Sequence, residues 1–307
     1  MHDPRSARPI LSVAEMRERE SGSGIDPAEL RRKNYIPPEA MPFKTSLTFT
    51  YDSGEFEKGM DLALKLADVA GFDKRKAESK KNGKLRGLGM SNTIERAAAP
   101  SLEGAEVRFD RGGTVQIFSG SINQGQGHET VLSQIVAGEL GLRPEDIDVT
   151  LEMDTAKDKW SIAAGTYSCR FTPGTAVAAK MAAAQMAKKL KDIGAKQLNV
   201  MAADVELANG KIRSISNPDN ALPFGRVAGT SHWSPVMLPE GMAPALSETG
   251  VWNPPELEPP AHDDRINTSL TYGFVFDMCG IEIDPITYQV KVDRYVSMHD
   301  AGKILNP

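Results

Sequence analysis

The spacing of apolar side chains predicts a chain of mixed helices and strands. Phe56, Met60, Leu64 and Ala67 recur at helical intervals and predict a helix from residue 55 to about residue 70. Elsewhere apolar and polar positions alternate, as they do in strands with one buried face. Strands are therefore predicted over 85–98, 105–110, 114–119 and 148–153, and a closing hairpin over 271–284 and 288–297.

Local signals predict further elements. Asp26-Pro27 is a helix cap followed by a proline suited to the first helical position, so a short helix is expected through Arg32. Thr172-Pro173 opens a helix over 174–192 in the same way. The other predictions are a strand over 45–51, a basic helix ending at Lys81, helices over 129–140 and 195–202, a hairpin at Asn209-Gly210, and a proline-rich irregular region over 223–260. The pattern indicates an α+β fold, with mixed sheets covered by helices.

A glycine-rich segment joins the strand over 114–119 to the helix over 129–140. Gly120–Thr130 reads Gly-Ser-Ile-Asn-Gln-Gly-Gln-Gly-His-Glu-Thr. Such a turn exposes backbone N–H groups at the positive end of a helix dipole. Its amide side chains add donors and acceptors without net charge. The segment suits an anionic, hydrogen-bond-rich ligand such as a phosphorylated cofactor.

A second polar segment has the same setting. Ala163–Arg170 reads Ala-Ala-Gly-Thr-Tyr-Ser-Cys-Arg and also leads into a helix N-terminus. Two such segments together suit the two ends of an elongated anion. Each is also compatible with a capped turn that has only a structural role, and the residues alone leave both interpretations open.

Composition and charge exclude several classes of protein. The net charge of -5 over 307 residues gives no electrostatic support for non-specific nucleic-acid binding. No long apolar run and no apolar signal segment are present, so we expect no membrane association and a cytoplasmic location. Two cysteines are too few for an iron–sulfur cluster or a structural zinc site, and the five histidines lack metal-ligand spacing. Phosphate-loop, dinucleotide-fingerprint and nucleophile-elbow motifs are absent.

Several motifs together resemble a known family. Gly-Gln-Gly-His-Glu-Thr at 125–130 resembles the molybdenum-binding large subunit of the xanthine dehydrogenase, aldehyde oxidase and carbon monoxide dehydrogenase family. The segments at 25–43 and 50–56 resemble the carbon-monoxide-dehydrogenase-like branch in particular. Gly165–Arg170, Ile283-Asp-Pro-x-Thr287 and His299–Pro307 agree in order along the chain. The resemblance covers about residues 25–307.

The resemblance implies a fold, a cofactor and its binding residues. The fold would be the molybdopterin-binding domain of molybdenum hydroxylases, incomplete here. Residues 1–24 would be a poorly packed lead-in, 25–104 the end of a first molybdenum-binding subdomain with connecting strands, and 105–307 a second subdomain that is truncated. The cofactor would be molybdopterin cytosine dinucleotide with molybdenum. The dithiolene of the pterin would hold the metal, and no side chain of the protein would ligate it. The cofactor's contacts would be Gln124, Gly125, Gln126, Gly127 and His128 in the first segment and Thr166, Ser168, Cys169 and Arg170 in the second.

The resemblance also implies what this chain lacks. Members of the family hydroxylate substrates with oxygen from water, assisted by a glutamate base that is expected beyond Pro307. The catalytic residue is therefore unknown in these residues, and we expect no turnover by the chain alone. Electrons would leave through an iron–sulfur small subunit and an FAD medium subunit. Exposed sheet edges also favour self-association.

Three functional hypotheses remain open. The first is part of a large subunit that oxidises carbon monoxide or a related small substrate. The second is an oxidoreductase of the same family that acts on aldehydes, purines or N-heterocycles. The third is a binding or assembly module that keeps the fold without the chemistry. Molybdenum and cytidine content would separate the third from the other two.

Overall fold

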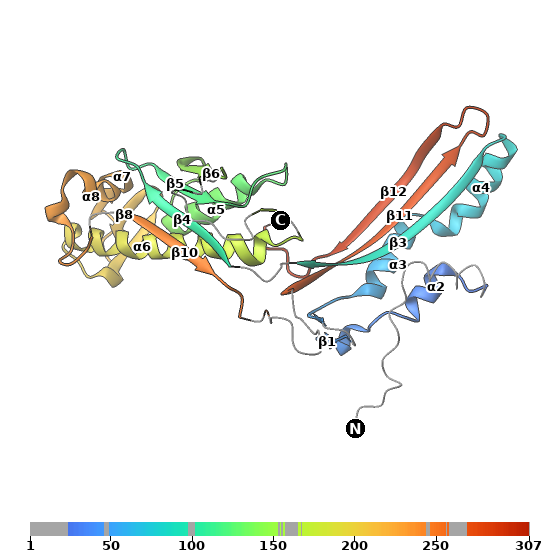
Figure 1. Ribbon diagram of the computed structural model, residues 1–307, viewed down its shortest axis with the longest axis horizontal. Helices are drawn as coiled ribbons and strands as arrows, with labels where there is room; N and C mark the ends of the chain where they lie inside the picture. The colour runs from blue at the N-terminus through green and yellow to red at the C-terminus, as the bar shows by residue number, and fades with distance from the viewer. Residues whose placement is uncertain are drawn as a thin grey trace, which may run out of the picture. The chain divides into compact units, whose positions relative to one another are not determined.

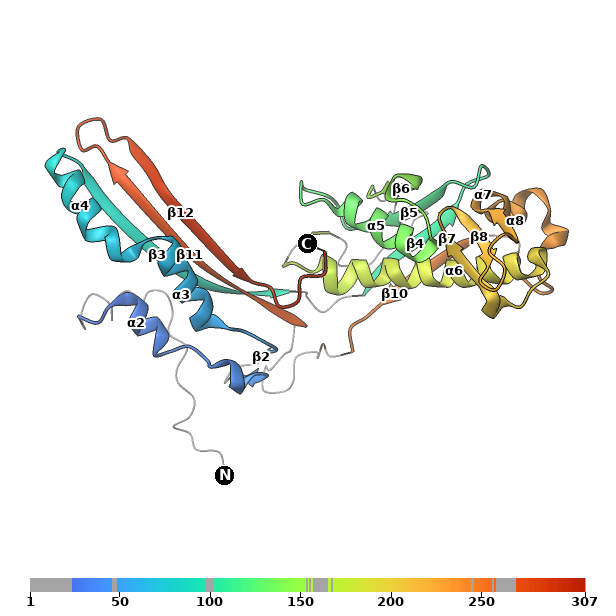
Figure 2. The ribbon, with the colours of Figure 1, turned by 180° about the vertical axis from the view of Figure 1, so that it is seen from behind.

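The computed structural model describes residues 24–45, 49–97, 102–152, 154, 156, 165–166, 168–243, 246–255, 257 and 269–306. The chain forms two compact units (Figures 1 and 2). The first unit holds Met1–Ala97 and Glu258–Pro307, and the second holds Ala98–Leu257. The predicted lead-in lies almost entirely outside the described residues.

A long antiparallel sheet organises the first unit. β11 (Thr271–Ile283) lies between β3 (Leu85–Ala97) and β12 (Val290–Asp300). Alternate side chains of β11 point to one face, and α3 (Phe56–Leu66) and α4 (Phe72–Lys81) lie along the sheet on that side (Figure 1). The alternation read from the sequence therefore sorts this sheet into a covered and an open face.

The core of the first unit lies between α3 and the sheet. Phe274, Phe276 and Met278 of β11 are at most 3% exposed, and Met60 and Ala63 of α3 are fully buried against them. These α3 residues come from the apolar face that the helical spacing predicted.

The N-terminal part of the first unit is short and irregular. α2 (Pro27–Arg32) is capped by Asp26, whose Oδ1 accepts the N–H groups of Ala28 at 2.9 Å and Glu29 at 3.1 Å. Asp52 accepts the N–H of Tyr272 at 3.2 Å, which ties this part to β11. The remaining elements are η1 (Pro38–Ala40), β1 (Phe43–Lys44), β2 (Thr50–Tyr51) and the 3₁₀ turn η2 (Val69–Gly71).

A mixed sheet organises the second unit. Its strands run in the order β10 (Ser247–Trp252), β4 (Glu103–Phe109), β5 (Val115–Ser119) and β6 (Ile147–Thr150). β4 pairs antiparallel with both β10 and β5, whereas β5 and β6 are parallel. The parallel pair requires a crossover, and the segment that makes it contains α5 (His128–Leu140).

Two helices cover one face of this sheet. α6 (Ala176–Leu198) packs on β10 and β4, and α5 packs beside it, on β6 and α6 (Figure 2). Four alanines of α6 are fully buried, which brings the helix close to the sheet: Ala178, Ala179, Ala182 and Ala183.

Smaller elements complete the second unit. β7 (Val205–Ala208), β8 (Lys211–Ser214) and β9 (Ala221–Pro223) form a second antiparallel sheet. The others are η3 (Pro144–Asp146), the π-helical turn η4 (Phe171–Thr175), η5 (Ala202–Asp204), α7 (Phe224–Ala228), α8 (Thr230–Trp233) and η6 (Pro235–Met237). None of the helices among the described residues combines the length and apolar character that crossing a bilayer requires.

The two helices predicted over 174–192 and 195–202 are wrong, because α6 is one helix that continues through Gly194. A Cβ at Gly194 would lie 2.5 Å from Cγ2 of Ile212, so this glycine allows α6 to pack closely on β8. It therefore does not end the helix.

The region over 223–260 is also not irregular throughout, since it contains α7, α8 and the edge strand β10. β10 depends on pairing with β4 and on the close approach of Gly250 to α6, where a Cβ would lie 2.0 Å from the Ala178 carbonyl oxygen. Neither feature leaves a clear apolar alternation in the sequence.

One further prediction differs from the structure. The strand expected over 45–51 is instead the short antiparallel pair β1–β2, closed by Thr45, whose Oγ1 accepts the Phe49 N–H at 3.0 Å. The first compact unit takes up the chain again after the second, because β11 returns to pair with β3. The division into molybdenum-binding subdomains at 104/105 stays a prediction. The α+β class itself is confirmed.

Candidate functional site

The first loop, Gly120–Gly127, connects β5 to α5 in the second unit. Gly125 and Gly127 have φ angles of 103° and 82°, a region open to glycine and costly for residues with a Cβ. Asn123 holds the turn, because its Oδ1 accepts the N–H groups of Gly125 at 3.3 Å and Gly127 at 3.1 Å. The loop therefore fixes its own backbone.

One side of the first loop is open. Gln124, Gly125 and Gln126 are exposed, and a Cβ built at Gly125 or Gly127 would meet no atom within 4 Å. The Oε1 atom of Gln126 accepts the Gln124 N–H at 2.5 Å, which leaves the Gln126 amide nitrogen as a donor. The loop thus presents neutral amide groups beside open space.

His128 begins α5 and is only 4% exposed. Its Nδ1 lies 3.2 Å from the Ser121 carbonyl oxygen, which can only accept, so this nitrogen carries the proton. Its ring stacks on Phe171, with centroids 3.8 Å apart and planes 11° apart. The prediction placed His128 beside a cofactor, and the structure places its ring between the first loop and the turn before α6.

Ser121 is a residue of the first loop that the sequence did not single out. It is 1% exposed, and its Oγ makes no hydrogen bond within the described part of the chain. A buried hydroxyl without a partner costs about 1–3 kcal/mol. A polar group bound at this loop would recover part of that cost, although nothing in the sequence distinguishes Ser121 from its neighbours.

The second loop, Gly165–Arg170, lies against the first. The Thr166 hydroxyl donates to the Ile122 carbonyl oxygen at 2.5 Å, so the structure brings together two segments far apart in sequence. Ser168 is half-buried and Cys169 is exposed, and both have φ angles of 48°. Tyr167 lies outside the described residues.

Arg170 ends the second loop and is 2% exposed. Its Nη2 forms an ion pair with Oε1 of Glu103, which is 4% exposed at the start of β4. Burial lowers the pKa of the Arg170 guanidinium. The group nevertheless stays charged, because the ordinary pKa of arginine lies far above neutral pH. The prediction placed Arg170 against a phosphate, and the structure places its guanidinium on Glu103.

Glu103 is a second residue that sequence reasoning missed, although a signal was present. It shares the inward face of β4 with Ala105, Val107 and Phe109. A carboxylate at an apolar position of a strand needs a buried cation or donor. The spacing could therefore have indicated a partner for Glu103, without saying which one.

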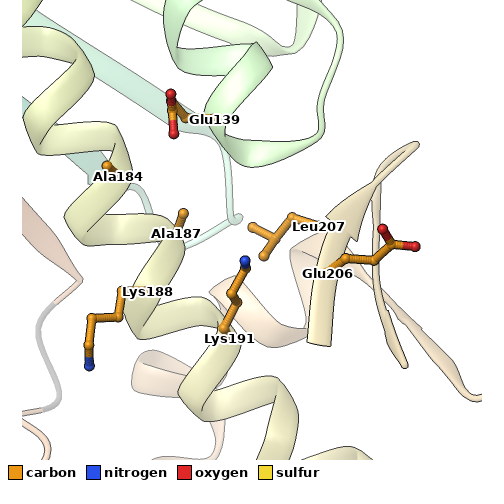
Figure 3. A pocket seen from close by; sticks show the side chains of 7 residues that line it. All are labelled: Glu139, Ala184, Ala187, Lys188, Lys191, Glu206 and Leu207. Atoms are coloured by element: carbon orange, nitrogen blue, oxygen red, sulfur yellow. The ribbon is translucent and has the colours of Figure 1, made fainter. Parts of the chain in front are cut away.

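A separate groove of about 370 Å³ lies between α5, α6 and β7. Glu139, Lys191 and Leu207 line it, and Lys188 points away from its centre in Figure 3. None of the predicted site residues contributes to this groove. Over the described residues, no three His, Cys, Asp or Glu side chains gather in a way that could hold a metal ion.

Comparison with known proteins defines the class. A family model described as a molybdopterin cofactor-binding domain matches residues 62–307. The carbon monoxide dehydrogenase large chain of Afipia carboxidovorans is 32% identical over 92% of this chain and 35% of its own length. The nicotine 6-hydroxylase large subunit of Paenarthrobacter nicotinovorans is 28% identical over 92% of this chain and 34% of its own.

A solved structure is similar as well. The crystal structure of the Cu,Mo-CO dehydrogenase in its carbon monoxide reduced state has a TM-score of 0.71 and 30% identity, covering 96% of this chain and 37% of that one. The chain belongs to the molybdopterin cofactor-binding family, in the branch of carbon-monoxide-dehydrogenase-like large subunits. The predicted family and fold are thereby confirmed. The chain spans about a third of the length of these relatives.

Proposed function

We propose that the first and second loops bind molybdopterin in its cytosine dinucleotide form. The observation that carries this proposal is the contact between the loops: Thr166 hydrogen-bonds to Ile122, and His128 stacks on Phe171. Two turns that each precede a helix thereby become one surface, which fits an elongated anion.

The donor set fits the cofactor chemically. The amides of Gln124 and Gln126 are exposed, and Gly125 and Gly127 allow a ligand to approach the backbone closely. The unpartnered Ser121 hydroxyl is a further donor at the same loop. Neutral donors and backbone N–H groups suit a pterin with phosphate groups, since they stabilise the anion without burying another charge.

Each loop has its own part in the proposal. The pterin side is held by Gln124, Gly125, Gln126 and Gly127. His128 packs behind this loop, where it contacts Ser121 and Phe171. Thr166, Ser168 and Cys169 lie on the phosphate and nucleotide side, where Cys169 contacts the ligand without binding metal. The bound cofactor supplies a molybdenum redox centre, and this chain's residues bind and orient it.

The wider activity is proposed from the relatives. We propose that a complete protein containing this chain oxidises carbon monoxide or a related small molecule with oxygen from water, together with iron–sulfur and FAD subunits. The relatives act on different molecules by name, carbon monoxide and nicotine among them. An aldehyde, purine or N-heterocycle is therefore the alternative substrate class.

Retention of molybdenum by matched variants tests the binding site. The chain and its Gln126→Ala variant are purified from a host that makes the cofactor, and molybdenum per chain is measured after dialysis. Loss of one hydrogen bond to a charged ligand lowers affinity by about tenfold, so Gln126→Ala is expected to retain far less metal. Gln185→Ala, exposed on α6, is the control. Equal retention by all three proteins would contradict the site, and folded chain without metal would favour a non-catalytic module.

A further inference from the structure

The second loop ends in a charge that solvent does not reach. Arg170 and Glu103 are 2% and 4% exposed, and they form an ion pair between the end of the loop and the start of β4. Thr175 Oγ1 donates to the other carboxylate oxygen of Glu103 at 3.3 Å. One carboxylate therefore binds Arg170, just before the π-helical turn η4, and Thr175, the last residue of that turn.

Neither charge is stable there alone. Glu103 lies on the apolar face of β4, where an unpaired carboxylate is strongly disfavoured. Removing one partner of a buried pair leaves the other charge uncompensated, which costs far more than the net worth of the pair. Arg170 is therefore committed to Glu103 before any ligand binds.

The neighbouring strand holds the same turn. Trp252 of β10 lies opposite Glu103 in the sheet register, and its Nε1 donates to the Pro173 carbonyl oxygen at 2.9 Å. Glu103 and Trp252, which face each other on neighbouring strands, thus both bind residues of η4. π-helical turns are rare and occur often at functional sites.

A strained stretch of backbone lies just before η4. Ser168 and Cys169 both have φ angles of 48°, a left-handed conformation that residues with a Cβ keep only when their surroundings hold it. Arg170 is the next residue, so its ion pair with Glu103 helps to determine where this backbone lies.

We propose that Glu103 and Arg170 position the second loop from the sheet, and that Arg170 is a positioning residue and does not contact the ligand. This inference deepens the proposed cofactor site and rests on it for its functional meaning. It adds Glu103, a residue outside both loops, to the residues on which binding depends.

Hydrogen–deuterium exchange of the ligand-free chain tests the positioning role. Glu103→Gln keeps the shape of the side chain and removes its charge, and exchange in residues 168–175 is expected to rise about tenfold. Exchange in α5 should stay unchanged, whereas a merely structural loss would raise it throughout the second unit. The control is Glu106→Gln, on the opposite face of β4, where the Ser247 hydroxyl donates to Glu106 at 2.5 Å. Unchanged exchange in Glu103→Gln would overturn the proposal.

A double-mutant cycle on molybdenum retention separates positioning from contact. If Arg170 acts through Glu103, then Glu103→Gln, Arg170→Met and the double variant all lose molybdenum by a similar factor. If Arg170 holds the anion itself, Glu103→Gln retains molybdenum and only the Arg170 variants lose it, which overturns the proposal. Should the wild-type chain retain none, the proposed function fails, and the exchange experiment still decides whether the pair positions the loop. If Glu103→Gln does not fold, Thr175→Val replaces it, because this variant removes only one hydrogen bond to Glu103. Its effect is measured as hydrogen–deuterium exchange in residues 168–175.

Discussion

The imidazole ring of His128 lies flat on the phenyl ring of Phe171, with centroids 3.8 Å apart and ring planes 11° apart. His128 is the first residue of α5, and Phe171 is the first residue of the turn that leads into α6. Both side chains are buried. The stack therefore joins the ends of the two loops.

Phe171→Ala should separate the two loops. Truncating a buried phenylalanine costs about 3–5 kcal/mol, and here it also removes the support of His128. Trypsin should then cleave after Arg170, which is buried in the wild type. Phe118→Ala is the control, since Phe118 is equally buried on the other face of the sheet, under Arg108. Cleavage after Arg170 at equal rates in both variants would mean that the stack does not hold the loop.

Gly250→Ala should destabilise the second unit selectively. A Cβ there would lie 2.0 Å from the Ala178 carbonyl oxygen, a backbone atom that cannot move aside alone. Overpacking of this kind costs about 1–3 kcal/mol. Gly138→Ala in α5 meets no atom within 4 Å and should instead stabilise by about 0.5–1 kcal/mol. Urea unfolding measures the free energy of unfolding of both variants. A change of the same sign in the two variants would contradict the close packing of α6 on β10.

Glu282 should make the first unit sensitive to acid. Hydrogen bonds from Ser79 and Lys84, and the ion pair with Arg86, lower the pKa of Glu282 from 4.5 to about 2. A carboxyl whose pKa is lower in the folded state stabilises the fold above pH 4.5, and that contribution is lost as the pH falls toward about 2.

Glu282→Gln should therefore be less stable than the wild type at neutral pH, and the difference should shrink progressively below pH 4.5. Thermal unfolding between pH 2 and pH 7 measures it. The exposed Glu95 on β3 provides the control variant, Glu95→Gln. A difference between wild type and Glu282→Gln that does not change with pH would refute the role of this network.

The chain alone should not oxidise substrates. It spans 35% of the carbon monoxide dehydrogenase large chain that it resembles, so most residues of that relative have no counterpart here. Dye reduction by the molybdenum-loaded chain should stay at the buffer rate with carbon monoxide, aldehydes, purines and N-heterocycles. Turnover with any of these substrates would contradict this prediction.

The sequence predicted the elements that local patterns determine. β11 alternates along most of its length, β3 and β12 alternate over part of theirs, and α3 carries its apolar residues at helical intervals. The first loop was found because its glycines and amides lie between a strand and a helix, an arrangement that depends on neighbours in sequence alone.

The sequence did not predict what depends on distant packing. Gly194 ends a helix by local rules, yet its contact with Ile212 keeps α6 continuous. β10 exists because it pairs with β4 and lets Gly250 approach α6. The site was limited in the same way, since the partner of Arg170 lies on another strand and no local rule connects it with Glu103.

The cofactor content of the purified chain is the decisive measurement for the proposed binding site in the two loops. The folded chain is isolated from a host that loads other molybdenum hydroxylases, and molybdenum and released cytidine monophosphate are measured per chain. If the two loops bind the cofactor, molybdenum and cytidine monophosphate are present in equal amounts, close to one of each per chain. A folded chain that carries neither would contradict the claim that the loops around His128 and Phe171 form a molybdopterin-binding site.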